Sequence, residues 1–209
     1  MRPCRGLYAV TDGGDRPVGD LVARVDQVLL GGAVLVQYRE KTGDTRRRGR
    51  EAAALLELCR ARGVPLIVND DARLARSLGA DGVHLGREDL PVAEARALLG
   101  PGPIIGASCY ADPDRALAAE AAGADYVAFG RFFPSRTKPL APGASVQLLA
   151  AVRPRLRVPI VAIGGITPEN APALVAAGAD LLAVVHGLFG EPDPRAAAAR
   201  FATLFETAP

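Results

Sequence analysis

Short apolar runs recur along the chain, and an amphipathic segment separates each run from the next. The apolar runs are continuous rather than alternating, which is typical of strands buried on both faces. The predicted strands span residues 7–11, 33–37, 65–68, 82–85, 104–107, 126–129, 160–163 and 181–185. The amphipathic segments predict helices over residues 18–30, 48–62, 72–78, 92–98, 113–122, 146–152, 169–177 and 194–205.

Strict alternation of strand and helix implies parallel pairing through crossover helices. Eight such units predict an α/β fold, a closed (β/α)8 TIM barrel, and we expect residues 1–209 to form one domain. Gly-Ala-Asp or a close variant follows four of the helices, at residues 31–33, 79–81, 123–125 and 178–180. Glycine is the expected helix terminator, so these units share a common plan. An open, doubly wound sheet is the alternative architecture.

Composition and charge exclude several classes of protein. The net charge of +2 comes from charges of both signs spread along the chain, so we expect no nucleic-acid surface. The one basic cluster, residues 46–50, is interpreted as the solvated first turn of a helix or as a local attractor of anionic substrates. No apolar stretch approaches the roughly 18 residues of a membrane span. Cys4, Cys59 and Cys109 lack metal or disulfide spacing, which predicts reduced thiols and a cytoplasmic location.

The barrel prediction gathers scattered polar residues into one site, because chemistry in this fold lies at the carboxyl ends of the strands. The polar residues that follow the predicted strands are Gln37, Arg39, Lys41, Asn69, Asp70, Asp71, Glu88, Asp89, Ser108, Ser135, Thr137 and Lys138. We therefore expect their side chains to share one mouth of the barrel.

Asp70 and Asp89 follow neighbouring predicted strands. Adjacent strands lie about 5 Å apart, so the two carboxylates can share one hard cation. Mg²⁺ is usually held by one or two carboxylates, with water and substrate phosphate completing its shell. Helix capping by Asn69-Asp70-Asp71 and by Glu88-Asp89 is the alternative for each segment taken alone. The pair together, with Lys41 nearby, favours a metal and phosphate site.

Residues 130–144 form an unusually long predicted loop after the sixth strand. Its Ser135, Thr137 and Lys138 offer two hydroxyls and an ammonium, donors suited to an anionic oxygen cluster, although a solvated surface turn remains the alternative. Lys41 and Lys138 are the only lysines among 25 basic residues. Where arginine is otherwise preferred, retained lysine indicates a need for a compact point charge.

Glycine-rich segments follow the last two predicted strands, at residues 164–167 and 185–187. Loops at these places form a phosphate cradle in many barrels, since glycine lets backbone N–H groups approach the ligand. His186 is either a base or a side chain that flanks this cradle, and we favour the flanking role. His84 lies inside an apolar strand and is interpreted as a packed core residue.

Motifs over almost the whole chain carry a resemblance to a known family. They lie at residues 7–12, 37–41, 68–70, 80–86, 88–91, 105–108, 130–139 and 162–166. On these motifs the chain resembles the thiamine-phosphate synthase family. Its members join a pyrimidine methyl diphosphate to a thiazole phosphate, release pyrophosphate and require Mg²⁺. The resemblance implies a transferase of thiamine biosynthesis with these two small-molecule substrates.

The resemblance also implies a role for each site residue. The implied ligands of the pyrimidine diphosphate are Gln37, Arg39, Lys41, Asn69, Ser108 and Lys138. Those of the thiazole phosphate are Ser135, Arg136, Thr137, Gly165, Val185 and His186. Asp70 and Asp89 are the implied Mg²⁺ ligands, and the implied catalytic residues are Arg39, Lys41, Ser108 and Lys138.

Three positions depart from the family pattern. Asp71 stands where arginine is usual, Arg87 where glutamine is usual, and His186 where serine is usual.

Two rival functions stay open: a thiazole tautomerase on the same barrel, and a sensor that binds a phosphate ligand without turnover. The carboxylate pair and the two lysines argue against the tautomerase, which has no pyrophosphate to hold. The sequence leaves the oligomeric state open.

Overall fold

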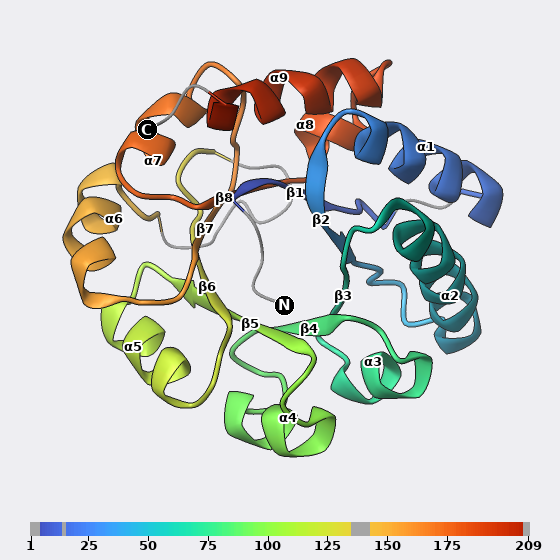
Figure 1. Cartoon of the computed structure of the whole chain (residues 1–209), viewed down its shortest axis with the longest axis horizontal. Helices are drawn as coiled ribbons and strands as arrows, with labels where there is room; N and C mark the ends of the chain where they lie inside the picture. Colours follow the sequence, from blue (N-terminus) through green and yellow to red (C-terminus); the bar gives the residue numbers. More distant parts are fainter. Residues whose placement is uncertain (1–4, 14–15, 135–142, 207–209) are drawn as a thin grey trace.

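Eight parallel strands close into a barrel in this computed structural model, which describes residues 5–13, 16–134 and 143–206 (Figure 1). Each strand pairs with its neighbours in sequence, and β1 pairs with β8 to close the ring. The strands are β1 Gly6–Val10, β2 Ala33–Tyr38, β3 Leu66–Asn69, β4 Gly82–Leu85, β5 Ile104–Tyr110, β6 Tyr126–Phe129, β7 Ile160–Ile163 and β8 Leu181–Val184. The predicted barrel is confirmed, and the open sheet is excluded.

Helices surround the barrel as an outer layer (Figure 1). They are α1 Val18–Leu30, α2 Thr45–Arg62, α3 Ala72–Leu78, α4 Val92–Leu99, α5 Pro113–Ala121, α6 Val146–Val152 with the 3-10 turn Arg153–Arg155, α7 Ala171–Ala176, α8 His186–Phe189 and α9 Pro194–Glu206. The sequence predicted a loop at residues 185–187, and this was wrong, because His186 begins the short helix α8. A four-residue helix is too short to show an amphipathic period.

Local sequence explains where the helices begin and end. The Asp44 side chain accepts a hydrogen bond from the Arg47 N–H, so α2 begins at Thr45, earlier than predicted. The same helix ends at Gly63, which has a φ of +68° in the left-handed region that glycine enters readily. Residues 46–50 therefore lie in the first turns of α2, as the first of the two interpretations held.

The core has two layers. The barrel interior is filled by Tyr8, Val10, Leu35, Ile67, Ile104, Tyr126, Ala128, Val161, Leu181 and Ala183. A larger apolar layer lies between the strands and the helices, where the free thiols Cys59 and Cys109 are buried. Burial raises the pKa of the Cys109 thiol to about 12. Both described cysteines are thus inert packing residues rather than reactive groups.

The aspartates of the Gly-Ala-Asp segments tie strands together in pairs at the amino ends of the barrel. Asp81, before β4, accepts a hydrogen bond at 2.9 Å from the backbone N–H of Leu66, at the start of β3. In the same way Asp125 accepts from the start of β5 and Asp180 from the start of β7, each at 2.8 Å. The three segments that contain an aspartate thus share one structural role, at the starts of β3, β5 and β7.

Removing one of these carboxylates should weaken the fold without touching the opposite mouth. Asp125 also forms a salt bridge with Arg96 at 2.5 Å, so Asp125→Ala leaves a backbone N–H and a guanidinium without this acceptor. We expect a loss of about 1–3 kcal/mol in the free energy of unfolding, measured by chemical denaturation. Exposed Glu57, changed to Ala, is the control. Equal stability of the two variants would contradict this role.

Candidate active site

A cavity of about 400 Å³ opens at the carboxyl ends of the strands. The predicted site residues that line it are Gln37, Arg39, Lys41, Asn69, Asp70, Ser108, Gly165, Val185 and His186. These residues come from five different strand ends or the loops that follow them. Parallel closure thus brings together side chains that are far apart in sequence, as the sequence predicted.

Four predicted site residues, Ser135, Arg136, Thr137 and Lys138, lie outside the described residues. The described segment that precedes them borders the cavity through Gly130, Arg131 and Pro134. Phe132 and Phe133 run beside the end of β7, where their N–H groups donate to the carbonyls of Ile163 and Gly164 at 3.2 and 3.0 Å. The roles of the four residues therefore stay predictions.

Cationic groups gather at one end of the cavity. Lys41 Nζ donates to the Asp70 carboxylate, with which it also forms a salt bridge. The Arg39 backbone is held by Thr11, whose hydroxyl accepts from the Arg39 N–H at 2.8 Å and donates to the Arg39 carbonyl at 3.0 Å. Burial lowers the pKa of the Arg39 guanidinium, and nearby Asp70 opposes this shift. This end can therefore hold an anionic ligand.

Asp70 and Asp89 form a carboxylate pair beside this cluster. Asp70 has a φ of +65°, a left-handed conformation that Asp tolerates better than most residues. The backbone therefore departs from the extended strand conformation directly after β3. Asp89 accepts a hydrogen bond from the Gly86 N–H at 2.6 Å. Burial raises the pKa of Asp89, and the Asp70 charge raises it further. Burial opposes ionisation of Asp70 too, but hydrogen bonds from Lys41 and Asp89 lower its pKa.

Helix capping, the alternative role for the acids after β3 and β4, holds for Asp71 but not for Asp70 or Asp89. Asp71 caps α3 by accepting a hydrogen bond from the Leu74 N–H at 2.9 Å. Asp70 is thereby left to face the cavity. Helix α4 begins after Pro91 without a side-chain cap, so Asp89 does not cap it. Asp89 itself lies next to Asp70 but does not line the cavity.

Glycines shape the opposite end of the cavity. Gly164 and Gly165 have φ values of +105° and +65°, which side chains other than glycine rarely adopt. A Cβ on Gly165 would lie 2.3 Å from the Pro134 carbonyl oxygen, so the backbone of the β6 loop packs directly on this turn. Val185 and His186 complete this end at the start of α8.

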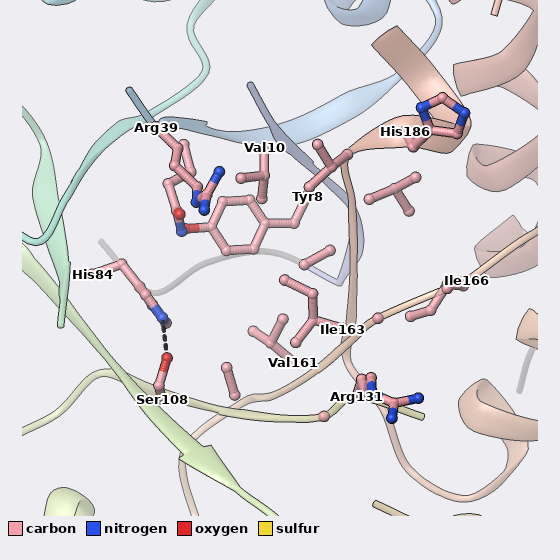
Figure 2. Close-up of a pocket in the computed structure, with 18 of the residues that line it drawn as sticks. Tyr8, Val10, Arg39, His84, Ser108, Arg131, Val161, Ile163, Ile166 and His186 are labelled. Carbon is pink, nitrogen blue, oxygen red and sulfur yellow. Dashed lines mark hydrogen bonds between the residues drawn. The ribbon is translucent and has the colours of Figure 1, made fainter. Parts of the chain in front are cut away.

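Sequence reasoning missed part of the site. His84 is buried, as expected of a core residue, but it also lines the cavity, and its Nε2 lies 2.8 Å from Ser108 Oγ (Figure 2). Arg115 Nε donates to the Ser108 carbonyl at 2.8 Å and so supports the end of β5. Tyr8 reaches the cavity from β1. A polar ring inside an apolar strand was the available signal for His84.

Within residues 5–13, 16–134 and 143–206, the chain has no group of three or more His, Cys, Asp or Glu side chains placed to hold a metal. This part of the chain likewise has no helix long and apolar enough to cross a membrane. Asp70 and Asp89 are thus a two-carboxylate arrangement, which suits a cation that keeps water or substrate oxygens in its shell.

A family model described as thiamine monophosphate synthase matches residues 7–188. The chain belongs to the thiamine monophosphate synthase family. A thiamine-phosphate synthase of Thioalkalivibrio sulfidiphilus is 54% identical over 97% of this chain and 96% of that protein. One of Thiobacillus denitrificans is 54% identical over 98% and 96%. Members of the family thus match this chain over almost its whole length.

The fold of this chain is similar to that of solved structures, one of which is a thiamine phosphate pyrophosphorylase. Thiamine phosphate pyrophosphorylase from Pyrococcus furiosus superposes with a TM-score of 0.88 at 34% identity, over 97% of this chain and 96% of that one. A 3-hexulose-6-phosphate synthase superposes with a TM-score of 0.70 at 19% identity, over 95% and 99%. The second likeness concerns the fold alone.

The structure accounts for two of the three departures from the family pattern. Asp71 caps α3 and forms a salt bridge with Arg48 at 3.1 Å, so it has a local structural role. The Arg87 guanidinium lies 4.8 Å from the ring centre of Tyr110, a cation–π contact at the edge of the cavity. His186 lines the cavity itself, which makes it the departure that bears on ligand binding.

The glycine turn gives a direct test of the site's shape. In Gly165→Ala the added methyl group collides with the Pro134 carbonyl and must adopt an unfavourable φ, so we expect a loss of about 1–3 kcal/mol in stability. The Michaelis constant for thiazole phosphate should rise as well. Gly49→Ala is the matched control, because a Cβ there meets no atom within 4 Å in helix α2. If both variants unfold at the same denaturant concentration, the packing constraint is wrong.

Proposed function

We propose that this chain joins the aminopyrimidine methyl diphosphate to thiazole phosphate and releases pyrophosphate, forming thiamine phosphate. The single observation that carries the proposal is one cavity with two different ends. Arg39, Lys41 and Asp70 form a charged end, and Gly164 and Gly165 form a backbone-lined end. Family membership supplies the activity, and the two ends supply a place for each substrate.

The reaction needs no protein nucleophile. An electron-rich pyrimidinyl methylene can lose pyrophosphate first, and the resulting cation is captured by the thiazole nitrogen. The C–O bond to the diphosphate breaks with its electron pair on oxygen, and a C–N bond then forms. The protein's task is to stabilise the departing charge and to position the second substrate.

Arg39 and Lys41 are suited to the departing pyrophosphate. Both line the charged end, and a fixed guanidinium and ammonium stabilise charge that develops on leaving oxygens. Lys138, the other lysine of the chain, is proposed to approach the same oxygens from the β6 loop. Asn69 and Ser108 lie at the same mouth and are proposed to orient the pyrimidine and its diphosphate.

The carboxylate pair fits Mg²⁺. Asp70 and Asp89 bring two acids together, and the pKa of Asp89 is raised by burial and then by the Asp70 charge, a repulsion that a divalent cation relieves. We propose that these two residues hold Mg²⁺. When bound, Mg²⁺ supplies positive charge beside the pyrophosphate oxygens. Lys41, hydrogen-bonded to Asp70, lies within the same charge cluster.

The thiazole phosphate is proposed to lie at the glycine end. Backbone N–H groups near Gly165 and Val185 can approach a phosphate closely, and Ser135, Arg136 and Thr137 are proposed to close over it. The cavity wall between the two ends is apolar, with Val161 and Ile163 among its residues. Such a wall excludes water, which would otherwise capture the pyrimidinyl cation as an alcohol. We also propose a cytoplasmic location, which the free, buried thiols support.

The experiment that tests the proposal mixes purified protein with both substrates and Mg²⁺ and follows thiamine phosphate. Formation of thiamine phosphate that depends on both substrates is the expected result. Isomerisation of a thiazole without pyrophosphate release would indicate the tautomerase instead. Binding of both substrates without any product would indicate a sensor. Either of these outcomes contradicts the proposed transferase.

Neutralising one carboxylate should raise the Mg²⁺ concentration that the reaction requires. Asp70→Asn and Asp89→Asn each remove one negative charge from the pair and keep the side-chain shape. We expect at least about tenfold slower turnover at limiting Mg²⁺, measured as initial rate against Mg²⁺ concentration. Asp71→Asn is the matched control, since asparagine also caps a helix. Wild-type Mg²⁺ dependence in both test variants would contradict the site.

The family departure at His186 should be tolerated. If backbone N–H groups hold the thiazole phosphate, the imidazole is secondary, and His186→Ser should leave the turnover rate within a few fold of wild type. The measurement is pyrophosphate release at saturating thiazole phosphate, together with its Michaelis constant. A collapse of turnover under saturation would place His186 among the catalytic residues.

A further inference from the structure

An unbroken chain of hydrogen bonds crosses the barrel interior from Gln37 to Ser108. Gln37 Nε2 donates to the Tyr8 hydroxyl at 2.7 Å, and the hydroxyls of Tyr8 and Tyr126 lie 2.7 Å apart. The Tyr126 hydroxyl lies 2.9 Å from His84 Nδ1, and His84 Nε2 lies 2.8 Å from Ser108 Oγ. Five strands contribute one residue each: β2, β1, β6, β4 and β5.

The chemistry of each group sets the direction of the whole chain. A Gln amide nitrogen only donates, so Tyr8 accepts from Gln37, and its own buried proton has an acceptor when it points toward Tyr126. A Tyr126 proton on this bond makes Nδ1 of His84 the acceptor, and an accepting Nδ1 requires the neutral ring that is unprotonated at this nitrogen. The ring proton is therefore on Nε2 and is donated to Ser108 Oγ.

Burial keeps this arrangement in a single state. Tyr8 and Tyr126 are 1% and 0% exposed, so water cannot supply a replacement partner. Desolvation raises the pKa of both hydroxyls, and each therefore keeps its one proton. Reversing any one bond would leave two donors or two acceptors facing each other in a buried site, which is costly. The ring of Tyr126 also stacks on His84, with centres 5.6 Å apart.

The two ends of the chain reach the cavity with opposite character. Gln37 directs its amide nitrogen to Tyr8, and its carbonyl oxygen remains as the acceptor of this side chain. Ser108 has accepted from His84, which leaves its hydroxyl proton to be donated. An aminopyrimidine edge presents the complement, an amine that donates beside a ring nitrogen that accepts. The corresponding oxo-pyrimidine presents the reverse, a carbonyl beside a ring N–H.

We propose that Tyr8, Tyr126 and His84 are positioning residues that fix the hydrogen-bond direction of Gln37 and Ser108, and so select an aminopyrimidine over its oxo counterpart. None of the three needs to bond the selected edge, because they act through the two ends of the chain. The inference rests on the proposed function, since it takes the pyrimidine as the ligand. Its tests below require no turnover.

The first test reads the state of His84 directly. The chain has two histidines, so ¹⁵N-histidine spectra of the wild type and of His186→Ser assign each ring. We expect His84 to be neutral with its proton on Nε2 in the protein without ligand. A proton on Nδ1, or on both nitrogens, would reverse or break the chain and would overturn the inference. Failure to form thiamine phosphate would contradict the proposed function but leave this spectrum unchanged.

The second test measures selectivity by calorimetry. The probes are the aminopyrimidine methyl monophosphate and its oxo counterpart, which lack the pyrophosphate leaving group. We expect the wild type to prefer the amino form by about 100-fold, and Tyr126→Phe to lower this preference about tenfold by interrupting the chain. Tyr8→Phe interrupts the chain at the neighbouring link and should lower the preference by a similar factor. The second variant keeps the test valid if one of the two fails to fold.

Tyr38→Phe is the matched control. Tyr38 is also buried and donates to Glu51 at 2.8 Å, but it takes no part in the chain. Its removal should leave the preference at the wild-type value while costing comparable stability. An unchanged preference in Tyr126→Phe, or an equal fall in Tyr38→Phe, would show that the buried tyrosines act on stability alone. A wild type that binds neither probe, or binds both equally, would likewise overturn the inference.

Discussion

Closure of the parallel barrel is the constraint on which the rest of this protein depends. Because β1 pairs with β8, every strand has a neighbour on both sides, and all eight carboxyl ends meet at one mouth. Residues as distant in sequence as Gln37 and His186 line a single cavity for this reason. At the opposite end, aspartates such as Asp125 join neighbouring strands and leave the mouth free for chemistry.

Two kinds of polar arrangement share the mouth. Around Asp70, charges of both signs lie together, and hydrogen bonds and charge link this carboxylate to Asp89 and Lys41. The buried chain through Tyr126 and His84, in the neutral state inferred above, is linked throughout by hydrogen bonds. The charged cluster suits a ligand whose charge changes during reaction, and the neutral chain suits recognition of a fixed shape.

The sequence predicted the barrel well because its signals were local and repeated. Continuous apolar runs and the glycines that end four of the units sufficed for strand number, order and the place of the site. What it missed depended on contacts between distant strands: the role of His84 arises only when β4 lies beside β5 and opposite Tyr126. Helix α8 was missed because four residues are too few to show an amphipathic period. The sequence did not distinguish Asp71 from Asp70, and only the structure shows that Asp71 caps α3.

The central claim is that one cavity holds both substrates while pyrophosphate leaves. A single-turnover experiment tests it most directly, with protein in excess over the pyrimidine diphosphate and with thiazole phosphate and Mg²⁺ present. The account predicts that thiamine phosphate and pyrophosphate appear together, at one rate and in equal amounts. Pyrophosphate that appears with the pyrimidine alcohol in place of thiamine phosphate would contradict it, because water would then reach the cation before the thiazole.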